Sequence, residues 1–281
     1  MTVNLIVLSV PLFFILIGIE VWISAKRRLP IYRASDALAN IGSGTVEQVL
    51  HAAWRFWNLG FYILVYEKFR WRDAPADSLW TWLIAFFGAD LAYYWWHRLT
   101  HEINFLWAGH VVHHQSEDYN LTVALRQNWL ADISSVPFYL PLALAGIPPT
   151  VYASMKSIMI LYQFWIHTQL VEKLGWFEWT FNTPSHHRVH HAINPKYVDK
   201  NYAGTFIIWD RLFGTFEKEM ERPVYGTIKR FASFNPLWAC LEYWAEVLKL
   251  WQASPGLRNK LWAWFAPPAW RPKELGGDVL I

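Results

Sequence analysis

The chain has 281 residues, of which 54% are apolar and only 17% charged, against about 45–50% and about 25% in soluble globular proteins. Its net charge of +3 is too small to indicate a nucleic-acid partner, and its single cysteine, Cys240, excludes an internal disulfide and a Cys-x-x-Cys metal site. The 20 Trp and 13 Tyr residues are typical of a chain that lies at membrane–water boundaries.

Five apolar stretches along the chain are long enough to enter or cross a bilayer as helices, since about 20 residues span its hydrocarbon core. The first is followed directly by the basic run 26–28, which predicts a cytoplasmic position for that end. Pro148 and Pro149 separate the last two and disfavour one continuous helix, so we expect a helical hairpin there. The five stretches are residues 4–24, 46–66, 78–96, 129–146 and 150–171.

Counting these spans places the polar segment 98–128 and the chain after residue 171 on the same side as the basic run. We therefore expect an all-α, multi-span membrane protein whose histidine-rich helical domain lies on the cytoplasmic face. A bacterial inner membrane or the endoplasmic reticulum would hold such a chain. The expected parts are residues 1–77 as N-terminal transmembrane segments, 78–217 as the histidine-bearing domain with its transmembrane hairpin, and 218–281 as a C-terminal segment and tail.

Nine of the eleven histidines fall in two short windows, five in residues 97–114 and four in residues 186–191. Their spacings of three and four residues place each cluster on one face of a helix, where two or three imidazoles can point at one place. His167 lies near the end of the last apolar stretch, at the same predicted membrane boundary. The candidate metal ligands are His97, His101, His110, His113, His114, His167, His186, His187, His190 and His191.

Nine or ten imidazoles are too many for one metal ion, because a zinc site uses three or four protein ligands. Two ions with four or five nitrogen ligands each fit the count. Neutral imidazole binds iron, copper, nickel and zinc, and the spacing does not choose among them.

An acidic residue, Asp90, interrupts the third apolar stretch, where a carboxylate is costly and often functional. It lies seven residues before His97, on the same helical face and about 10 Å along the axis. That distance is too long for contact with His97, so Asp90 is expected either to orient a histidine of another cluster or to be capped by neighbouring Tyr or Trp side chains.

The C-terminal segment contains apolar residues at spacings of four and three, which predict one helix with an apolar stripe. Two interpretations stay open: the helix lies at the membrane interface, or it packs on the histidine-bearing domain. The stripe consists of Leu237, Leu241, Trp244, Leu248 and Trp251.

The histidine boxes His97-x-x-x-His101, His110-x-x-His113-His114 and His187-x-x-His190-His191 resemble those of the fatty acid hydroxylase and sterol desaturase superfamily, integral-membrane di-iron enzymes. Within it, the chain resembles the ether-lipid-cleaving branch, the alkylglycerol monooxygenases, over roughly residues 85–217. The segments that carry this likeness are 90–102, 107–127, 164–167 and 182–216.

The resemblance implies that residues 78–217 form a di-iron catalytic domain in an oxidoreductase. It further implies two iron ions, O2 as co-substrate, and tetrahydrobiopterin or a reductase as electron donor. The substrate would be a membrane lipid, an alkylglycerol ether cleaved to an aldehyde and a glycerol lipid. Glu102 and His186 match additional active-site positions of the family.

Three other functions are weighed against this one. A sterol, carotenoid or fatty-acyl hydroxylase or desaturase would use the same iron pair. A zinc hydrolase is disfavoured because the chain has no His-Glu-x-x-His. A metal-binding membrane protein or transporter typically places its ligands near the bilayer midplane, whereas these clusters lie at the predicted ends of the spans.

Overall fold

The protein is described here by a computed structural model covering residues 5–277. Within that range the fold is all-helical, with two isolated β-bridges and no β-strand. The predicted all-α class is confirmed.

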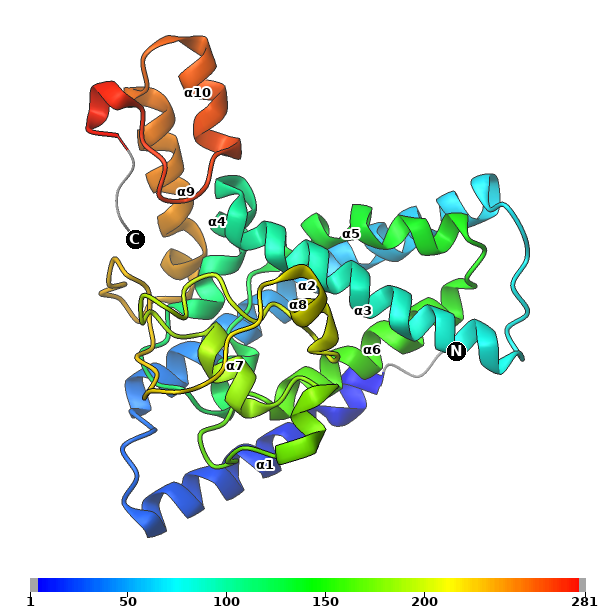
Figure 1. Cartoon of the computed structure of the whole chain (residues 1–281), viewed down its shortest axis with the longest axis horizontal. Helices are drawn as coiled ribbons and strands as arrows, with labels where there is room; N and C mark the ends of the chain where they lie inside the picture. The colour runs from blue at the N-terminus through cyan, green and yellow to red at the C-terminus, as the bar shows by residue number, and fades with distance from the viewer. Residues whose placement is uncertain (1–4, 278–281) are drawn as a thin grey trace.

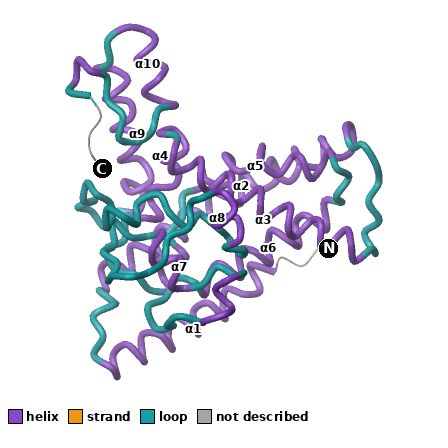
Figure 2. Tube along the Cα trace, viewed as in Figure 1, coloured by secondary structure: helices purple, strands orange, loops and turns teal. Residues whose placement is uncertain are grey.

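Five long helices run side by side along the length of the molecule (Figures 1 and 2). Helix α2 packs on α5, helix α3 packs on α5 and α6, and helix α1 packs on α6. Their shared core includes Tyr62 of α2 and Tyr152 of α6, whose rings stack at a centroid distance of 4.0 Å. The helices are α1 (Leu5–Arg27), α2 (Ala34–Phe69), α3 (Leu79–Glu102), α5 (Trp129–Leu144) and α6 (Pro149–Trp165).

The connections 70–78 and 145–148 lie together at one end of this bundle, which we term the distal end. The Trp71 amide donates to the Leu144 carbonyl at 2.8 Å, and the Ala74 amide donates to the Gly146 carbonyl at 3.2 Å. Gly146 has a φ of +85°, and a Cβ atom there would collide with the carbonyl oxygen of Arg72. The predicted helical hairpin therefore closes through a turn that requires glycine.

The opposite end, which we term the histidine end, joins the α1–α2 connection to the segment that follows the second histidine box. The Arg33 amide and guanidinium bind Asp118 at 2.7 and 3.0 Å, and the Asn120 side chain donates to the Ile31 carbonyl at 2.7 Å. From within α1, Glu20 accepts a hydrogen bond from the Leu121 amide at 2.8 Å. The first helix is thus fastened to the histidine-bearing segments.

Short helices and turns complete the histidine end, and the hairpin of α9 and α10 projects from the body (Figure 1). This hairpin is fastened through Asn104, whose side chain donates to the Ala263 carbonyl and accepts from the Tyr243 hydroxyl, both at 2.8 Å. The elements are α4 (Asn104–His114), η1 (Leu121–Leu125), η2 (Gly175–Trp179), α7 (Pro184–His190), α8 (Ile208–Phe213), α9 (Pro236–Ala253), α10 (Gly256–Phe265) and η3 (Lys273–Leu275).

The predicted C-terminal helix is confirmed as α9, and most of its apolar stripe faces outward. Ala239 and Cys240 pack against Val112 of α4, whereas Leu237 and Leu241 on the stripe are exposed. Trp244, in the middle of the stripe, packs instead against Phe105 of α4, with ring centroids 5.5 Å apart. The helix therefore contacts the histidine-bearing domain through its small residues and through Trp244, and leaves the leucines of the stripe exposed.

Among the described helices, only α1 is both long and apolar enough to cross a bilayer by itself, over Leu8–Arg27. Helices α5 and α6 have 16 and 17 residues, shorter than the roughly 20 that a span requires. The helices thus form where the apolar stretches predicted them, and the number of spans stays a prediction.

Substituting Gly146→Ala should destabilise the protein, because a left-handed backbone costs an L-residue about 1–2 kcal/mol and the new Cβ meets the Arg72 carbonyl. The measurement is the thermal unfolding midpoint in detergent. Gly60→Ala in α2 is the matched control, since a Cβ there meets nothing within 4 Å, and it should be neutral or stabilising. Equal midpoints for both variants would contradict the proposed tight turn.

Candidate metal centre

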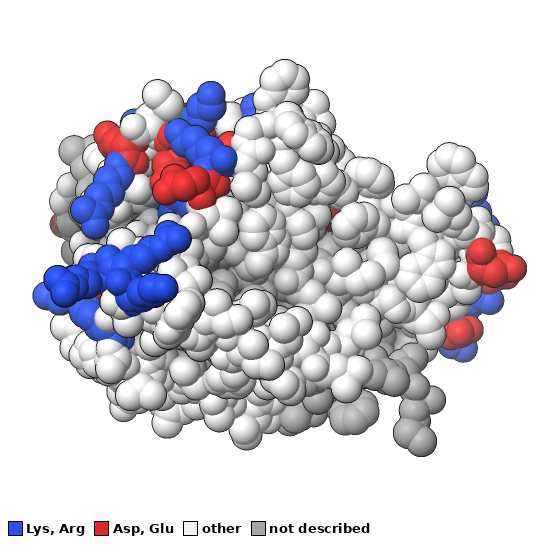
Figure 3. Space-filling view, turned by 90° about the horizontal axis from the view of Figure 1, so that it is seen from below, with Lys and Arg blue, Asp and Glu red and all other residues white. Residues whose placement is uncertain are grey.

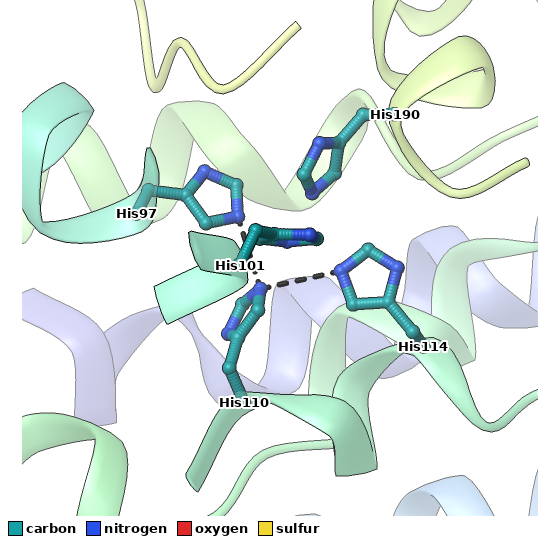
Figure 4. A group of neighbouring side chains, drawn as sticks. All are labelled: His97, His101, His110, His114 and His190. Atoms are coloured by element: carbon teal, nitrogen blue, oxygen red, sulfur yellow. Dashed lines mark hydrogen bonds between the residues drawn. The ribbon is translucent and has the colours of Figure 1, made fainter. Parts of the chain in front are cut away.

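Nine of the ten predicted ligands come together in two buried groups. In each group, one ring nitrogen from every member lies within 4.8 Å of those of all the others. The five-histidine group, drawn in Figure 4, contains His97, His101, His110, His114 and His190. The four-histidine group contains His113, His167, His187 and His191.

Helical geometry explains how the histidine boxes are divided between the groups. Residues four apart differ by about 40° around a helix, whereas adjacent residues differ by about 100°. His110 and His114 on α4 therefore point to the same group, while His113 turns to the other. Around α7, His187 and His191 share one group, and His190 joins the opposite one. The expectation that each box serves one point is corrected: α4 and α7 serve both groups.

The two groups are in direct contact with each other. The ring of His114 stacks on the ring of His191 at a centroid distance of 4.4 Å, although the two residues belong to different groups. Helices α4 and α7 therefore hold the two groups next to each other.

The inward-facing nitrogens are separated by distances that suit metal coordination. Imidazole nitrogens bind zinc at about 2.0–2.1 Å, so two ligands at a right angle lie about 3 Å apart. The Nε2–Nε2 distances are 3.0 Å for His97–His110, 3.2 Å for His110–His114, 3.1 Å for His113–His167, 2.9 Å for His167–His187 and 3.2 Å for His187–His191.

In four of the nine histidines, the outer ring nitrogen, Nδ1, is fixed by a backbone carbonyl. A carbonyl oxygen can only accept, so each Nδ1 that contacts one carries the proton, and the lone pair of a neutral ring lies on Nε2. The contacts are His97 to Tyr202 at 2.7 Å, His113 to Arg126 at 3.0 Å, His167 to Gln163 at 2.7 Å and His190 to Lys200 at 3.0 Å.

The residues present therefore fit a bound cation in each group. His113 and His167 both donate from Nδ1, so their Nε2 lone pairs face each other across 3.1 Å with no proton between them. In the five-histidine group, Nε2 of His101 and of His190 is buried without a hydrogen-bond partner among the described residues. A metal ion would replace repulsion with coordination at the first place and would give the two nitrogens at the second place a partner.

Electrostatics keeps these rings available as ligands. Burial, reinforced by neighbouring imidazoles, lowers the pKa of His110 and His114 well below the usual histidine range. Burial likewise lowers the pKa of His113 to about 4. The rings are therefore neutral at neutral pH, which is the form that binds a metal.

His186 is the predicted ligand that the structure does not place in either group. It is buried, and its ring meets Phe216 at a centroid distance of 5.4 Å. Because it directly precedes His187, it points about 100° away around α7. Its assignment as a ligand is corrected on this geometry, which leaves His187 as the member of the pair that faces a group.

Neither predicted acidic residue contacts an imidazole through the hydrogen bonds that the structure shows. Asp90 is fully buried and accepts from the amides of Thr205 and Phe206 and from the Trp209 indole, at 2.7, 2.9 and 2.9 Å. The expectation that it orients a histidine directly is therefore corrected. Glu102 accepts from Arg98, one turn earlier on α3, at 2.7 Å.

Comparison with known proteins connects this site to a family. Residues 82–215 match the family model described as Fatty acid hydroxylase. The chain is 45% identical to alkylglycerol monooxygenase of Homo sapiens over 265 residues, which are 94% of this chain and 59% of that protein. It is 44% identical to alkylglycerol monooxygenase of Xenopus tropicalis over 260 residues, 92% of this chain and 58% of that one.

An ornithine lipid hydroxylase of Rhizobium tropici is 29% identical over 129 residues, 46% of this chain and 39% of that protein. The chain thus spans less than two thirds of the length of the animal relatives, and no solved structure matches it. The resemblance inferred from the histidine boxes is confirmed. Its expected extent was too narrow, since the similarity covers nearly the whole chain.

Alanine substitutions at the adjacent residues His186 and His187 test which of the two is a metal ligand. His187→Ala should lower the metal content from two ions per chain toward one, because it removes a member of the four-histidine group. His186→Ala, the matched control, should retain both ions. Elemental analysis of purified protein after dialysis gives the stoichiometry, and metal loss in the His186 variant alone would reverse the assignment.

Proposed function

From the match of residues 82–215 to the family model described as Fatty acid hydroxylase, we propose that the chain is a membrane-bound di-iron monooxygenase acting on a lipid C–H bond. The observation that carries this proposal is the convergence of nine buried imidazoles into two adjacent groups. Two iron ions would occupy them, the five-histidine group holding one and the four-histidine group the other. Bound iron would supply O2 activation, with two electrons from a donor.

The protein's own residues provide position and a dry environment. Neutral rings, buried and tied to carbonyls through Nδ1, keep the inward nitrogens aimed without reorganisation. The aromatic rings of Tyr202 and Trp107 approach the five-histidine group, with centroids 5.3 and 4.8 Å from that of His101, and help exclude water from it. A substrate carbon brought beside this group would react away from solvent.

We infer an alkylglycerol as the substrate because the alkylglycerol monooxygenases of Homo sapiens and Xenopus tropicalis match more than nine tenths of the chain. Oxygen would be inserted at the carbon next to the ether oxygen. One atom of O2 enters the lipid and the other leaves as water, with two electrons and two protons from tetrahydrobiopterin or a reductase. The hydroxylated carbon is a hemiacetal, which separates into an aldehyde and a glycerol lipid.

The distribution of charge supports a bilayer around the helices. Figure 3 shows a broad face without Lys, Arg, Asp or Glu, with charged side chains gathered at its two ends. On α1, Leu8, Ile15 and Trp22 are 64%, 59% and 61% exposed, which is costly in water and favourable in lipid. The charge-free face would lie in the hydrocarbon core, with the histidine end on the cytoplasmic side beside the basic run 26–28.

The hairpin of α9 and α10 would lie on the membrane surface of that same side. The exposed leucines on α9 are joined by exposed apolar side chains on α10, where Leu257 and Leu261 are 74% and 54% exposed. The cations Lys249 and Arg258 accompany these apolar side chains, as in helices that bind the headgroup region. The exposed leucines of the stripe favour an interfacial position of the C-terminal helix, which is compatible with its packing on α4.

The activity test uses purified, iron-loaded protein and a defined alkylglycerol, and it measures aldehyde release with and without tetrahydrobiopterin. Release should require both O2 and the pterin and should fall to background in His113→Ala. The His186→Ala protein serves as the folded control of the same substitution type.

Other outcomes of this activity test would support the alternative functions. An alcohol product from a sterol, carotenoid or fatty-acyl lipid would replace the ether substrate and keep the di-iron chemistry. Tightly held iron with no O2 consumption on any lipid would contradict the monooxygenase and support a metal-binding membrane protein.

The orientation has its own test, because the single native cysteine, Cys240, is buried. Cysteines are introduced at Asp73 in the distal end or at Lys229 in the histidine end, whose native side chains are 75% and 70% exposed. A membrane-impermeant maleimide should label Asp73→Cys on intact cells and label Lys229→Cys only after permeabilisation. Labelling of both from the same side would refute the spanning arrangement.

A further inference from the structure

We propose that two buried carboxylates, Asp90 and Asp210, clamp the segment 199–206 and thereby position ligands of the five-histidine group, and of that group alone. This inference rests on the proposed metal-binding function. Neither carboxylate would touch metal or substrate, so both are positioning residues.

The clamp consists of hydrogen bonds from backbone amides to the two carboxylates. Asp210 accepts from the amides of Tyr202 and Ala203, both at 2.8 Å. Asp90 accepts from the amides of Thr205 and Phe206 at 2.7 and 2.9 Å. Four of the five amides in residues 202–206 are thus held by two side chains from different helices, α3 and α8.

The remaining position, Gly204, shows how closely the segment lies against α3. A Cβ atom there would come within 2.8 Å of the Tyr93 ring and 3.0 Å of the Asp90 carboxylate. Only glycine lets the backbone approach this closely without displacing one of them.

The clamped segment contacts three of the five ligands of the five-histidine group. The Tyr202 carbonyl accepts from His97 at 2.7 Å, and the Lys200 carbonyl accepts from His190 at 3.0 Å. The Asp199 carboxylate lies 3.5 Å from Nδ1 of His101. One short stretch of chain therefore orients imidazoles from α3 and α7 together.

The link between clamp and ligand is most direct at one peptide unit. The carbonyl of Tyr202 and the amide of Ala203 belong to the same planar peptide, so fixing one fixes the other. Asp210 binds that amide, and His97 binds that carbonyl. Rotation of this peptide would break both hydrogen bonds, which makes the Asp210 carboxylate an indirect support of the His97 ring.

Backbone strain accompanies the Lys200 contact. Asp199 and Asn201, on either side of Lys200, both have a φ of +58°, a left-handed conformation that asparagine and aspartate adopt more readily than most residues. The Asn201 side chain holds the turn by donating to the His186 and Glu217 carbonyls at 3.1 and 2.7 Å and accepting from the Glu217 amide. Such strain persists where surrounding contacts maintain it, commonly at functional sites.

In the four-histidine group, the two rings whose Nδ1 atoms donate to backbone carbonyls use other parts of the chain. The carbonyl partners of His113 and His167 are Arg126, after η1, and Gln163, within α6. Neither lies in the segment 199–206. Loosening the clamp should therefore affect one group and leave the other intact.

The test compares metal binding by Asp210→Asn, Asp90→Asn and the unaltered protein. An asparagine amide turns an N–H donor toward backbone amides that also donate, so the segment must shift. Loss of such outer support typically weakens metal binding about 10–100-fold. We expect titration with a chelator to become biphasic, with one ion per chain released at 10–100-fold lower chelator concentration and the second unchanged.

Mössbauer spectra of protein loaded with iron-57 provide a readout independent of activity. In the Asp→Asn variants the signal of one iron site should broaden or disappear while the other is retained. Asp36→Asn is the matched control, since Asp36 is also buried but accepts from Ser116 and Asn40. It should leave the five-histidine signal unchanged.

Milder variants cover the case in which an Asp→Asn protein does not fold. Trp209→Phe removes one donor from Asp90, and Thr215→Val removes one donor from Asp210, each leaving the carboxylate in place. Both should weaken binding of the same single ion to a smaller degree. Parallel loss of both ions, or full retention of both, would overturn the clamp. Fewer than two ions in the unaltered protein would instead contradict the proposed function.

Discussion

Repulsion between imidazole lone pairs in a dry interior is the constraint on which this structure depends. The rings of His113 and His167 donate outward through Nδ1, and their Nε2 atoms lie 3.1 Å apart. Without a cation between them, these two nitrogens make no favourable interaction with each other. Burial prevents the alternative of protonation by lowering the pKa of rings such as His113. Metal binding would therefore provide part of the folding free energy of the histidine end, as it does in small metal-dependent domains.

In this architecture, the parts of the chain that carry the histidine ligands differ from the parts that orient them. Helices α3, α4 and α7 and their ends present every ring except that of His167, which follows α6. Because α4 and α7 each serve both groups, the groups adjoin each other at His114 and His191. Orientation comes from carbonyls on loops and helix ends, and these differ between the groups. The five-histidine group depends on the segment 199–206, whereas the four-histidine group depends on the chain near Arg126 and Gln163. The orientation of the ligands can therefore change at one site without changing at the other, although the two sites share helices.

Much of this could be predicted from the sequence, because helical periodicity is local. The number and spacing of the histidines predicted ligands for two ions, and Pro148 and Pro149 marked the hairpin that the structure shows between α5 and α6. The division of each box between two groups could not be predicted, because it depends on how α4 and α7 face each other. The partners of Asp90 lie 115 residues or more along the chain, and the carbonyls that hold the rings carry no side-chain signature. The direction of the α9 stripe was undetermined for the same reason: periodicity defines a face but not what it meets.

The central claim is that nine imidazoles form two separate metal centres, five around one and four around the other. Anomalous diffraction at the iron absorption edge from crystals of the iron-loaded protein tests it most directly. The account predicts two peaks, one enclosed by His97, His101, His110, His114 and His190 and one by His113, His167, His187 and His191, with His186 coordinating neither. A single peak, or a peak bound by His186, would contradict it.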